Sequence, residues 1–400
     1  MLAIPQVRRL VLGLVAEFQD RLIREGRLNR SMSIVAASSG LEPHAIDALA
    51  VDEATLGLDS LATIELVTHL NVFLGLDKTG VEDYLLVRRT LGDWVELVDH
   101  HFSRLGPDVS ITFETSGSTG HPKRVRQSRE ALESEIAGLL DGPLRDSAVT
   151  RVMCSVPVTH IYGFLWALLL PMRLGVEAID LPTGLPSAML RQARPGDLVI
   201  ATPFSWDRTP SCGGRFEPRV TGVTSGGPTT ETTWRAGKSS GLSRMIEIYG
   251  SSETGGVGWR DAQDRPFHTM PDLALQNPAV PEVVRRGSGV LDLQDRLEWV
   301  GDRGFHVIGR RDPVVQVAGT NVNLFELRAL IEAEPDVQEA AVRLDGDRLK
   351  AFIVQSENAA ADIEQRLRSK LSRLPPPARP DRFSFGSALP RTATGKPADW

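Results

Sequence analysis

The pattern of apolar and polar positions changes twice along the chain. Up to about residue 104, apolar side chains recur at steps of three and four residues, which is the spacing of helices that bury one face. The first 22 residues predict one amphipathic helix. Two further helices are predicted from the apolar sets Leu61, Ile64, Val67, Leu70 and Leu74, and Leu91, Trp94, Val95 and Val98.

From about residue 108 to 308 the chain consists of short apolar runs separated by Gly, Pro, Ser and Thr. Runs such as RVMCSVPV, DLVIATP and RMIEIYG resemble buried strands that lead into functional loops. From about residue 310 a smaller unit follows. It is predicted to contain strands at VVQVAG, EAAVRL and LKAFIV, helices at 324–334 and 363–374, and a stiff connector at LPPPARP.

These patterns predict an α/β protein with a helical domain at 1–104, an α/β core at 105–310 and a small α+β domain at 311–400. The formal charge of −6 lacks the basic excess of nucleic-acid-binding proteins. The longest apolar run, Phe164–Met172, is far shorter than the ~20 residues that cross a membrane. Cys154 and Cys212 are too few for a disulfide framework. We therefore expect a soluble cytoplasmic protein without nucleic-acid or membrane partners.

Candidate chemistry is concentrated first in the segment TFETSGSTGHPK, residues 112–123. Its glycines allow backbone N–H groups to surround an anion, its hydroxyls add hydrogen-bond donors, and Lys123 adds a positive charge. This composition suits a triphosphate, although the spacing does not fit a Walker A loop. Taken alone, a loop rich in Ser, Gly and Thr is a flexible turn more often than a nucleotide site.

Six further segments follow this loop: SVPVTHIYGF (155–164), TSGGPT (224–229), EIYGSSETGG (247–256), WVGDRGFHVIGRRD (299–312), VAGTNVNLFELR (317–328) and LPRTATGKPADW (389–400). Together they resemble, in the same order, the motifs of the adenylate-forming superfamily, which includes acyl-CoA ligases, carrier-protein ligases, adenylation domains and luciferases. The resemblance implies ATP and Mg²⁺ as cofactors, and an adenylation core followed by a small mobile C-terminal lid domain.

The resemblance assigns nucleotide-binding roles residue by residue. Glu253 would hold Mg²⁺, because this ion prefers carboxylate oxygens beside phosphates. Ser252 stands at the α-phosphate, where the family usually has threonine. The loop over the β- and γ-phosphates would consist of Thr115, Ser116, Gly117, Ser118, Thr119, Gly120 and Lys123. The rest of the nucleotide would be held by Ser225, Gly226, Gly227, Pro228, Tyr249, Gly250, Ser251, Asp302 and Arg310.

The resemblance also assigns catalytic roles. Lys396, in PRTATGK, matches the C-terminal lysine whose ammonium bridges the attacking carboxylate and the α-phosphate. Asp312 matches the hinge about which the C-terminal domain turns between adenylation and thioester formation, and Gly319 would let a pantetheine arm pass. His160 is the second catalytic candidate. The acid pocket would be lined by His160, Tyr162, Gly227 and Gly250.

Two of these pocket residues have an alternative interpretation. His160 is also compatible with a hydrogen-bonded core histidine. Core packing explains Tyr162 as well as a pocket does.

The segment GLDSL and the helix after it resemble an acyl carrier protein, in which Ser60 would receive 4′-phosphopantetheine. A plain helix-capping serine and a degenerate carrier used as a scaffold remain open. The chain also departs from the superfamily, because few residues outside 1–104 precede the phosphate loop. In addition, only 302 − 253 = 49 positions separate Glu253 from Asp302. We therefore expect a reduced ligase whose missing lobe is absent or replaced by residues 1–104 or by another subunit.

The predicted reaction joins a small carboxylic acid to AMP and then transfers the acyl group to the pantetheine thiol of an acyl carrier protein. The reduced frame resembles the aryl-acid activators of bacterial aryl-polyene pigment pathways, which favours a hydroxybenzoate-like acid. Free coenzyme A is the alternative acceptor. A non-catalytic nucleotide- or acyl-adenylate-binding module is the alternative class, although retention of Lys123, Glu253, Asp302 and Lys396 argues against it.

Overall fold

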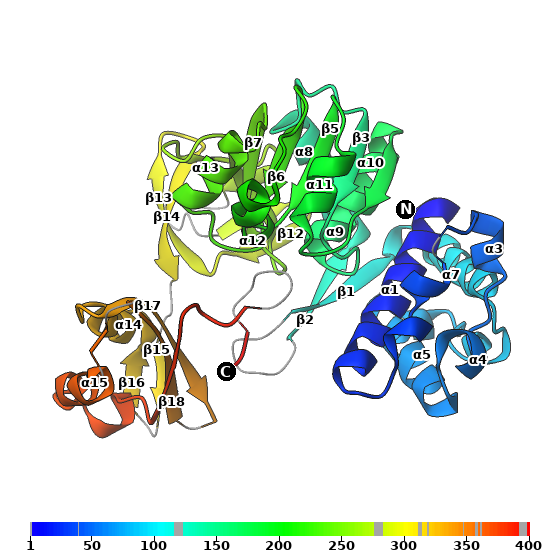
Figure 1. Ribbon diagram of the computed structural model, residues 1–400. Helices are drawn as coiled ribbons and strands as arrows, with labels where there is room; N and C mark the ends of the chain where they lie inside the picture. The colour runs from blue at the N-terminus through cyan, green and yellow to red at the C-terminus, as the bar shows by residue number, and fades with distance from the viewer. Residues whose placement is uncertain are drawn as a thin grey trace. The chain divides into compact units, whose positions relative to one another are not determined.

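The computed structural model describes residues 2–400 except 39, 116–122, 276–282, 311–313, 318–319, 347, 357–358, 361 and 392–397. The chain forms two compact units (Figure 1). The first contains Met1–Thr115, Arg124–Asp292 and Trp299–Phe305, and the second contains Ser116–Lys123, Leu293–Glu298 and His306–Trp400. Among the described residues, no helix combines the length and the apolar character needed to cross a lipid bilayer. The predicted domain boundaries at 104 and 310 stay predictions.

The N-terminal part of the first unit is helical, as predicted. Its long helices begin at clear sequence signals: Asp59 caps α5 through the N–H of Ala62, and Thr90 and Asp93 form a reciprocal capping box on α7. Gly75 ends α5 in the left-handed conformation. The helices are α1 (Ile4–Arg24), α2 (Ile34–Ala37), α3 (Pro43–Asp47), α4 (Glu53–Leu56), α5 (Ser60–Leu74), α6 (Tyr84–Val87) and α7 (Leu91–Leu105).

The predicted apolar face of α5 is only partly correct. Leu61 and Ile64 are 61% and 52% exposed, whereas Val67, Leu70 and Leu74 are buried as expected. The buried face instead begins with Ala62 and Thr63 and continues through Leu66. The first turn of α5 therefore presents two apolar side chains to solvent.

A nine-stranded sheet has the order β13-β14-β9-β8-β7-β6-β5-β3-β4, and its strands from β9 to β4 lie in the first unit. Strands β4-β3-β5-β6-β7 are parallel, and β8, β9 and β14 continue antiparallel. The bounds are β3 (Arg151–Cys154), β4 (Glu177–Asp180), β5 (Asp197–Ala201), β6 (Thr221–Thr224), β7 (Arg244–Ser251), β8 (Gly255–Arg260), β9 (Phe267–Thr269), β13 (Asp295–Val300) and β14 (Gly304–Arg310).

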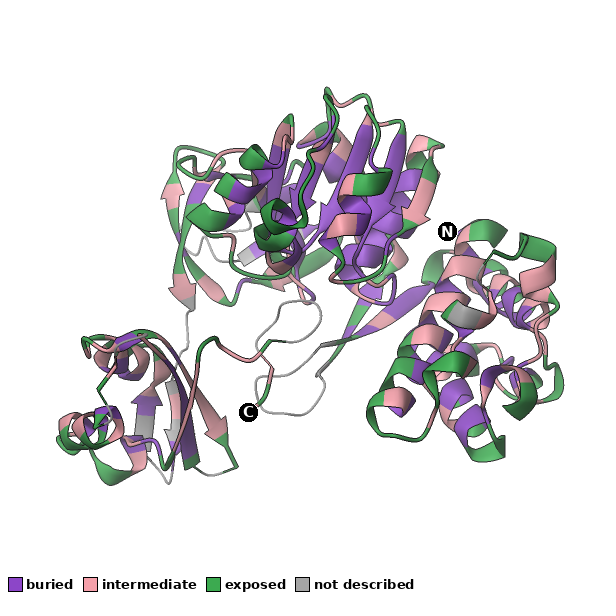
Figure 2. Cartoon of the chain, viewed as in Figure 1, coloured by how far each residue is buried: buried purple, intermediate pink, exposed green. Residues whose placement is uncertain are grey.

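Strands β3 and β5 are buried along their whole length (Figure 2). Such strands are continuous apolar runs because both faces of a parallel sheet are covered. In Figure 1, α11 and α13 lie in front of the sheet. The covering helices are α8 (Arg129–Asp141), α9 (Ile161–Gly163), a π-helical turn (Phe164–Leu169), α10 (Leu170–Leu174), α11 (Pro186–Gln192), α12 (Pro203–Arg208) and α13 (Glu231–Ser239).

Two small sheets accompany this large one. The hairpin of β1 (Ser110–Thr115) and β2 (Lys123–Ser128) encloses the predicted phosphate loop, most of which lies outside the described residues. Strands β10 (Leu273–Leu275), β11 (Val283–Arg286) and β12 (Gly289–Asp292) form the other sheet.

The helical part packs directly on the core within the first unit. Arg9 of α1 forms an ion pair of 2.5 Å with Asp180 at the end of β4 and donates to the carbonyl of Ala167. A Cβ at Gly13 would lie 2.4 Å from Val158 Cγ2. Helix α1 therefore approaches the loop before His160 so closely that only glycine fits at this position.

The second unit has its own core around Ile331, Leu349, Ile353 and Leu367. The predicted strands and helices are present, but β16 and β19 were not predicted. The LPPPARP connector contains a 3₁₀ turn at Pro376–Ala378. Strand β19 adds parallel to β18. The elements are β15 (Val314–Val317), β16 (Thr320–Asn323), α14 (Leu324–Glu332), β17 (Val337–Asp345), β18 (Arg348–Gln355), α15 (Ile363–Leu371) and β19 (Arg382–Gly386). The predicted α/β class is thus confirmed.

Candidate active site

The predicted nucleotide segments meet at one edge of the large sheet. Strands β6 and β7 are parallel neighbours, with Thr224 opposite Glu247. The segment 225–228 therefore leaves the sheet beside the last residues of β7, which lead into the turn at 252–253. Ser225 Oγ reinforces this by donating to the carbonyl of Ile248 at 2.9 Å. The loop that carries His160 follows β3 at the same carboxyl-terminal edge. This edge is where open α/β sheets bind their ligands.

Backbone geometry at this edge requires glycine. Gly226 has φ +83°, a left-handed conformation that side chains rarely adopt. A Cβ at Gly250 would lie 2.0 Å from the carbonyl oxygen of Gly255, where β7 and β8 pair irregularly. At Gly227 the nearest atom to such a Cβ, Pro203 Cγ, is 3.9 Å away. The backbone of β8 therefore leaves no room for a side chain at position 250. The surface over Gly227, in contrast, has space for a flat group.

The turn that carries Glu253 is held by hydroxyl groups at its base. Ser251 Oγ and Thr254 Oγ1 lie 3.1 Å apart, and each accepts a hydrogen bond from the other residue's backbone N–H. Ser252 is buried and Glu253 is half-buried at the tip of this turn. The structure thus presents the α-phosphate and magnesium candidates together on one short turn.

Gln127 ties this turn to the strand that leaves the phosphate loop. Its buried side chain donates from Nε2 to the carbonyl of Ser252 at 2.7 Å and to that of Glu253 at 3.1 Å. Sequence analysis missed Gln127. The available signal was its position two residues after Val125, on the inward-facing side of an alternating strand.

A buried charge network supports the same turn from behind. Glu135 Oε1 accepts the N–H of Gly256 at 2.6 Å, and its other oxygen lies 3.2 Å from Arg286 Nη1. Arg286 also pairs with Asp272 at 2.6 Å and donates to the carbonyls of Thr254 and Gly256. Burial raises the pKa of the Glu135 carboxyl, and the charge of Arg286 opposes that rise.

Tyr249 belongs to an aromatic cluster beside the turn. Its half-buried ring lies 5.6 Å from the rings of Phe267 and Phe305, which stack on each other at 5.5 Å. Asp302 is exposed in the turn between β13 and β14, three residues before Phe305. Arg303 fixes that turn by donating to the carbonyl of Met270 at 2.6 Å.

His160 lies where the helical part meets the core. Together with Thr159 it lines a small cavity of about 30 Å³, whose other walls come from α1, α5 and β1. Glu17 of α1 and His69 of α5 line it too, with His69 Nε2 3.6 Å from Glu17 Oε2. Burial raises the pKa of Glu17, but its partners His69, Thr159 and His160 outweigh burial and hold the pKa below its usual value.

Tyr162 is placed differently. Its hydroxyl donates to the carbonyl of Ala201 at 3.3 Å, and its ring packs edge-on against Trp166. Burial raises the pKa of this phenol well above its usual value. The contacts of Tyr162 are thus those of a core residue next to the His160 loop.

Ser60 is exposed at the start of α5. The capping hydrogen bond of this helix is accepted by Asp59, so capping does not account for Ser60.

Several predicted residues lie outside the described part of the chain, and their roles stay predictions: Ser116, Gly117, Ser118, Thr119, Gly120, Asp312, Gly319 and Lys396. The strands include Thr115, Lys123 and Arg310, but their side chains are likewise outside the described part.

The described carboxylates suit a magnesium ion that is bound jointly with phosphates. Within the described ranges, no three His, Cys, Asp or Glu side chains gather into a metal site. Mg²⁺ beside a nucleotide needs only one or two protein carboxylates, because phosphates and water supply the other ligands. Glu253, at the tip of its turn, fits that requirement.

Similarity to known proteins decides the family. The AMP-binding enzyme model matches residues 98–278, and the model of the AMP-binding enzyme C-terminal domain matches 326–396. A 4-coumarate–CoA ligase of Cereibacter sphaeroides is 48% identical over 98% of this chain and 96% of its own length. The chain belongs to the AMP-binding enzymes. A second 4-coumarate–CoA ligase, from Rhodobacter capsulatus, is 38% identical over 98% of this chain and 100% of its own.

The solved structures agree on the fold. The ATP-bound MatB of Rhodopseudomonas palustris superposes with a TM-score of 0.56 at 18% identity, over 98% of this chain and 91% of that one. The AMP-binding family confirms the predicted superfamily, so the chain is an AMP-forming acid ligase that uses ATP and Mg²⁺. The two relatives match the helical part as well, so the reduced frame is shared with them.

Proposed function

We propose that this ligase adenylates an aromatic acid of the 4-coumarate class and transfers the acyl group to coenzyme A. The observation that carries the proposal is similarity along almost the whole chain to two 4-coumarate–CoA ligases, helical part included. This replaces the hydroxybenzoate-like acid favoured by the sequence patterns. The resemblance to pigment-pathway activators gains no support from these relatives.

The residues at the carboxyl-terminal edge of the large sheet would bind the nucleotide. The base would lie over Gly227, beside the ring of Tyr249, with Asp302 as the acceptor for the ribose hydroxyls. The turn at Ser252 and Glu253 would hold the α-phosphate and Mg²⁺, and its fixed position costs no reorganisation during reaction. Gln127 and the Glu135–Arg286 pair would act as positioning residues for this turn.

The helical part would replace the missing lobe at the acid pocket. Three observations support this: α1 touches the loop before His160 at Gly13, and Glu17 and His69 share a cavity with that histidine. The acid would then bind between the His160 loop and the helices, so residues 1–104 would be part of the active site.

The test compares acids and acceptors in one assay. The purified chain is given ATP, Mg²⁺ and either 4-coumarate or 4-hydroxybenzoate, with coenzyme A or a phosphopantetheinylated carrier protein, and the thioester is measured by mass. We expect 4-coumaroyl-CoA as the dominant product. Thioester formed only on the carrier protein, or only from 4-hydroxybenzoate, would contradict the proposal.

A carrier role for the helical part is the second candidate. It is favoured by the exposed Ser60 behind Asp59, and the exposed apolar pair Leu61 and Ile64 beside it leaves an uncovered surface. Co-expression with a phosphopantetheinyl transferase should then add one phosphopantetheine to the intact mass. Ser60→Ala should abolish this addition and leave adenylation unchanged. An unmodified wild-type mass would reduce the domain to a scaffold.

A further inference from the structure

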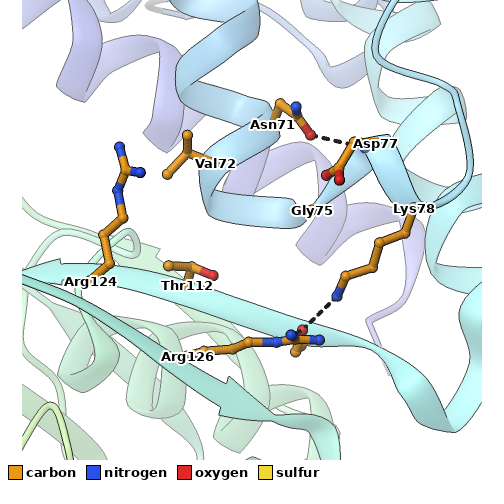
Figure 3. Close-up of a pocket in the computed structure, with 9 residues that line it drawn as sticks. Asn71, Val72, Gly75, Asp77, Lys78, Thr112, Arg124 and Arg126 are labelled. Atoms are coloured by element: carbon orange, nitrogen blue, oxygen red, sulfur yellow. Dashed lines mark hydrogen bonds between the residues drawn. The ribbon is translucent and has the colours of Figure 1, made fainter.

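An open cavity of about 340 Å³ lies on the outer face of the β1–β2 hairpin (Figure 3). Its walls are the C-terminal end of α5, the turn that follows it, and the two strands. The residues that line it are Asn71, Val72, Gly75, Asp77, Lys78, Ser110, Thr112, Arg124 and Arg126. Neither the nucleotide site nor the acid pocket described above includes this cavity.

Two positive side chains in the cavity converge on one neutral hydroxyl. Lys78 Nζ donates to Ser110 Oγ at 3.0 Å, and Arg126 Nε donates to the same oxygen at 2.7 Å. Figure 3 shows the two cations reaching this point from opposite walls. Among the described carboxylates, none forms an ion pair with Lys78 or Arg126, whereas the neighbouring Arg124 pairs with Glu114 at 3.0 Å.

This arrangement places two exposed positive charges beside each other. Partial desolvation lowers the pKa of Lys78, the charge of Arg126 lowers it further, and Asp77 and Asp108 only partly oppose these effects. Two cations that share a serine repel each other. An anion between them would remove that repulsion and form charge-assisted hydrogen bonds, which are stronger than neutral ones.

The cavity also adjoins the proposed acid pocket around His160. Val72 and Thr112 line both this cavity and the smaller one that contains His160. Ser110, Thr112 and Glu114 lie on one face of β1, two residues apart, so the strand leads from the cationic end to the His160 end. A ligand with its phosphates at Ser110 could therefore extend along β1 toward the reacting acyl group.

We propose that Lys78 and Arg126 bind phosphate groups of coenzyme A in this cavity. The inference rests on the proposed function, in which coenzyme A is the acceptor. Coenzyme A suits the geometry because a long pantetheine arm separates its phosphates from its thiol. The phosphates of ATP are expected at the loop between β1 and β2, close to the reacting carboxylate.

The test uses the double variant Lys78→Gln/Arg126→Gln with three thiol acceptors: coenzyme A, dephospho-coenzyme A and pantetheine. The KM for coenzyme A should rise roughly 10–100-fold, which is the loss of binding expected when one or two charge-assisted hydrogen bonds are removed. With pantetheine, which has no phosphates, variant and wild type should react equally. Acid-dependent ATP–pyrophosphate exchange should stay unchanged. The dephospho form shows whether the 3′-phosphate or the diphosphate is bound.

Arg235→Gln is the matched control, because it removes an exposed positive charge on α13 that lies outside the cavity. A second readout uses adenosine 3′,5′-bisphosphate, which should inhibit the thioester step in the wild type and in the control but not in the double variant. Lys78→Gln alone covers the case in which the double variant does not fold.

Failure of the proposed acceptor and failure of the proposed phosphate site give different results. A wild type that adenylates acid but forms no acyl-CoA would overturn the proposed acceptor. A wild type that forms acyl-CoA, together with variants that keep its KM for coenzyme A, would overturn the phosphate site alone.

Discussion

At the scale of single residues, one turn carries the candidates for α-phosphate and Mg²⁺ binding. Ser252 and Glu253 occupy its tip, and the motif that contains them could be predicted from the sequence. The residues that hold this turn in place could not be predicted. They are Gln127, Glu135 and Arg286, which lie up to 126 positions away along the chain. No local pattern marks such distant partners, because folding alone brings them together.

Glu253→Gln should lower acid-dependent ATP–pyrophosphate exchange by roughly 10²–10³-fold, the loss typical for one charge-stabilising group. The physical reason is that a neutral amide holds Mg²⁺ weakly beside the phosphates. Raising the Mg²⁺ concentration should restore part of the activity. Exchange at the wild-type rate would show that Glu253 does not hold the metal.

Arg286→Met should reduce the free energy of unfolding by about 3–5 kcal/mol, because it leaves the carboxylates of Glu135 and Asp272 buried without their partner. Urea unfolding measures this loss. Arg235→Gln, which breaks an exposed pair, should stay within about 0.5 kcal/mol of wild type. If Arg286→Met were as stable as Arg235→Gln, the buried network of Glu135, Asp272 and Arg286 would not stabilise the turn.

At the scale of elements, the docking of α1 on the core decides whether the helical part belongs to the active site. The hydrophobic pattern predicted α1 and α5 correctly. It failed at Leu61 and Ile64, since periodicity alone does not reveal which apolar residues find a partner. The parallel strand β19 was missed because its pairing with β18 is decided by tertiary packing.

Gly13→Ala tests this docking. Within an isolated helix the change would stabilise by about 1 kcal/mol. Here the new methyl group would clash with Val158, so we expect lower stability and a higher KM for the acid. Adding Val158→Ala should recover part of both losses, as measured by a double-mutant cycle. A Gly13→Ala variant more stable than wild type would contradict the close approach.

At the scale of the whole molecule, the chain is an AMP-binding ligase whose reduced frame is shared with its relatives. The ordered motifs were sufficient for the superfamily and for the fold class. They did not decide the acid or the acceptor. The proposed acid pocket would use α1 and α5, whose sequences carry no family motif.

Lys396→Ala should reduce adenylation roughly 10²–10³-fold, because the carboxylate and the α-phosphate would approach each other without a bridging ammonium. Thioester formation from preformed acyl adenylate should stay near the wild-type rate. A single-turnover assay of each half-reaction separates the two. An equal loss in both steps would contradict the proposed alternation of the C-terminal domain.

The most direct test of the account follows the adenylate itself. The purified chain is mixed with 4-coumarate, ATP and Mg²⁺, and the products are identified by mass before and after coenzyme A is added. The account predicts pyrophosphate and 4-coumaroyl-AMP first, then AMP and 4-coumaroyl-CoA. Release of ADP and phosphate, or no acyl adenylate at all, would contradict it.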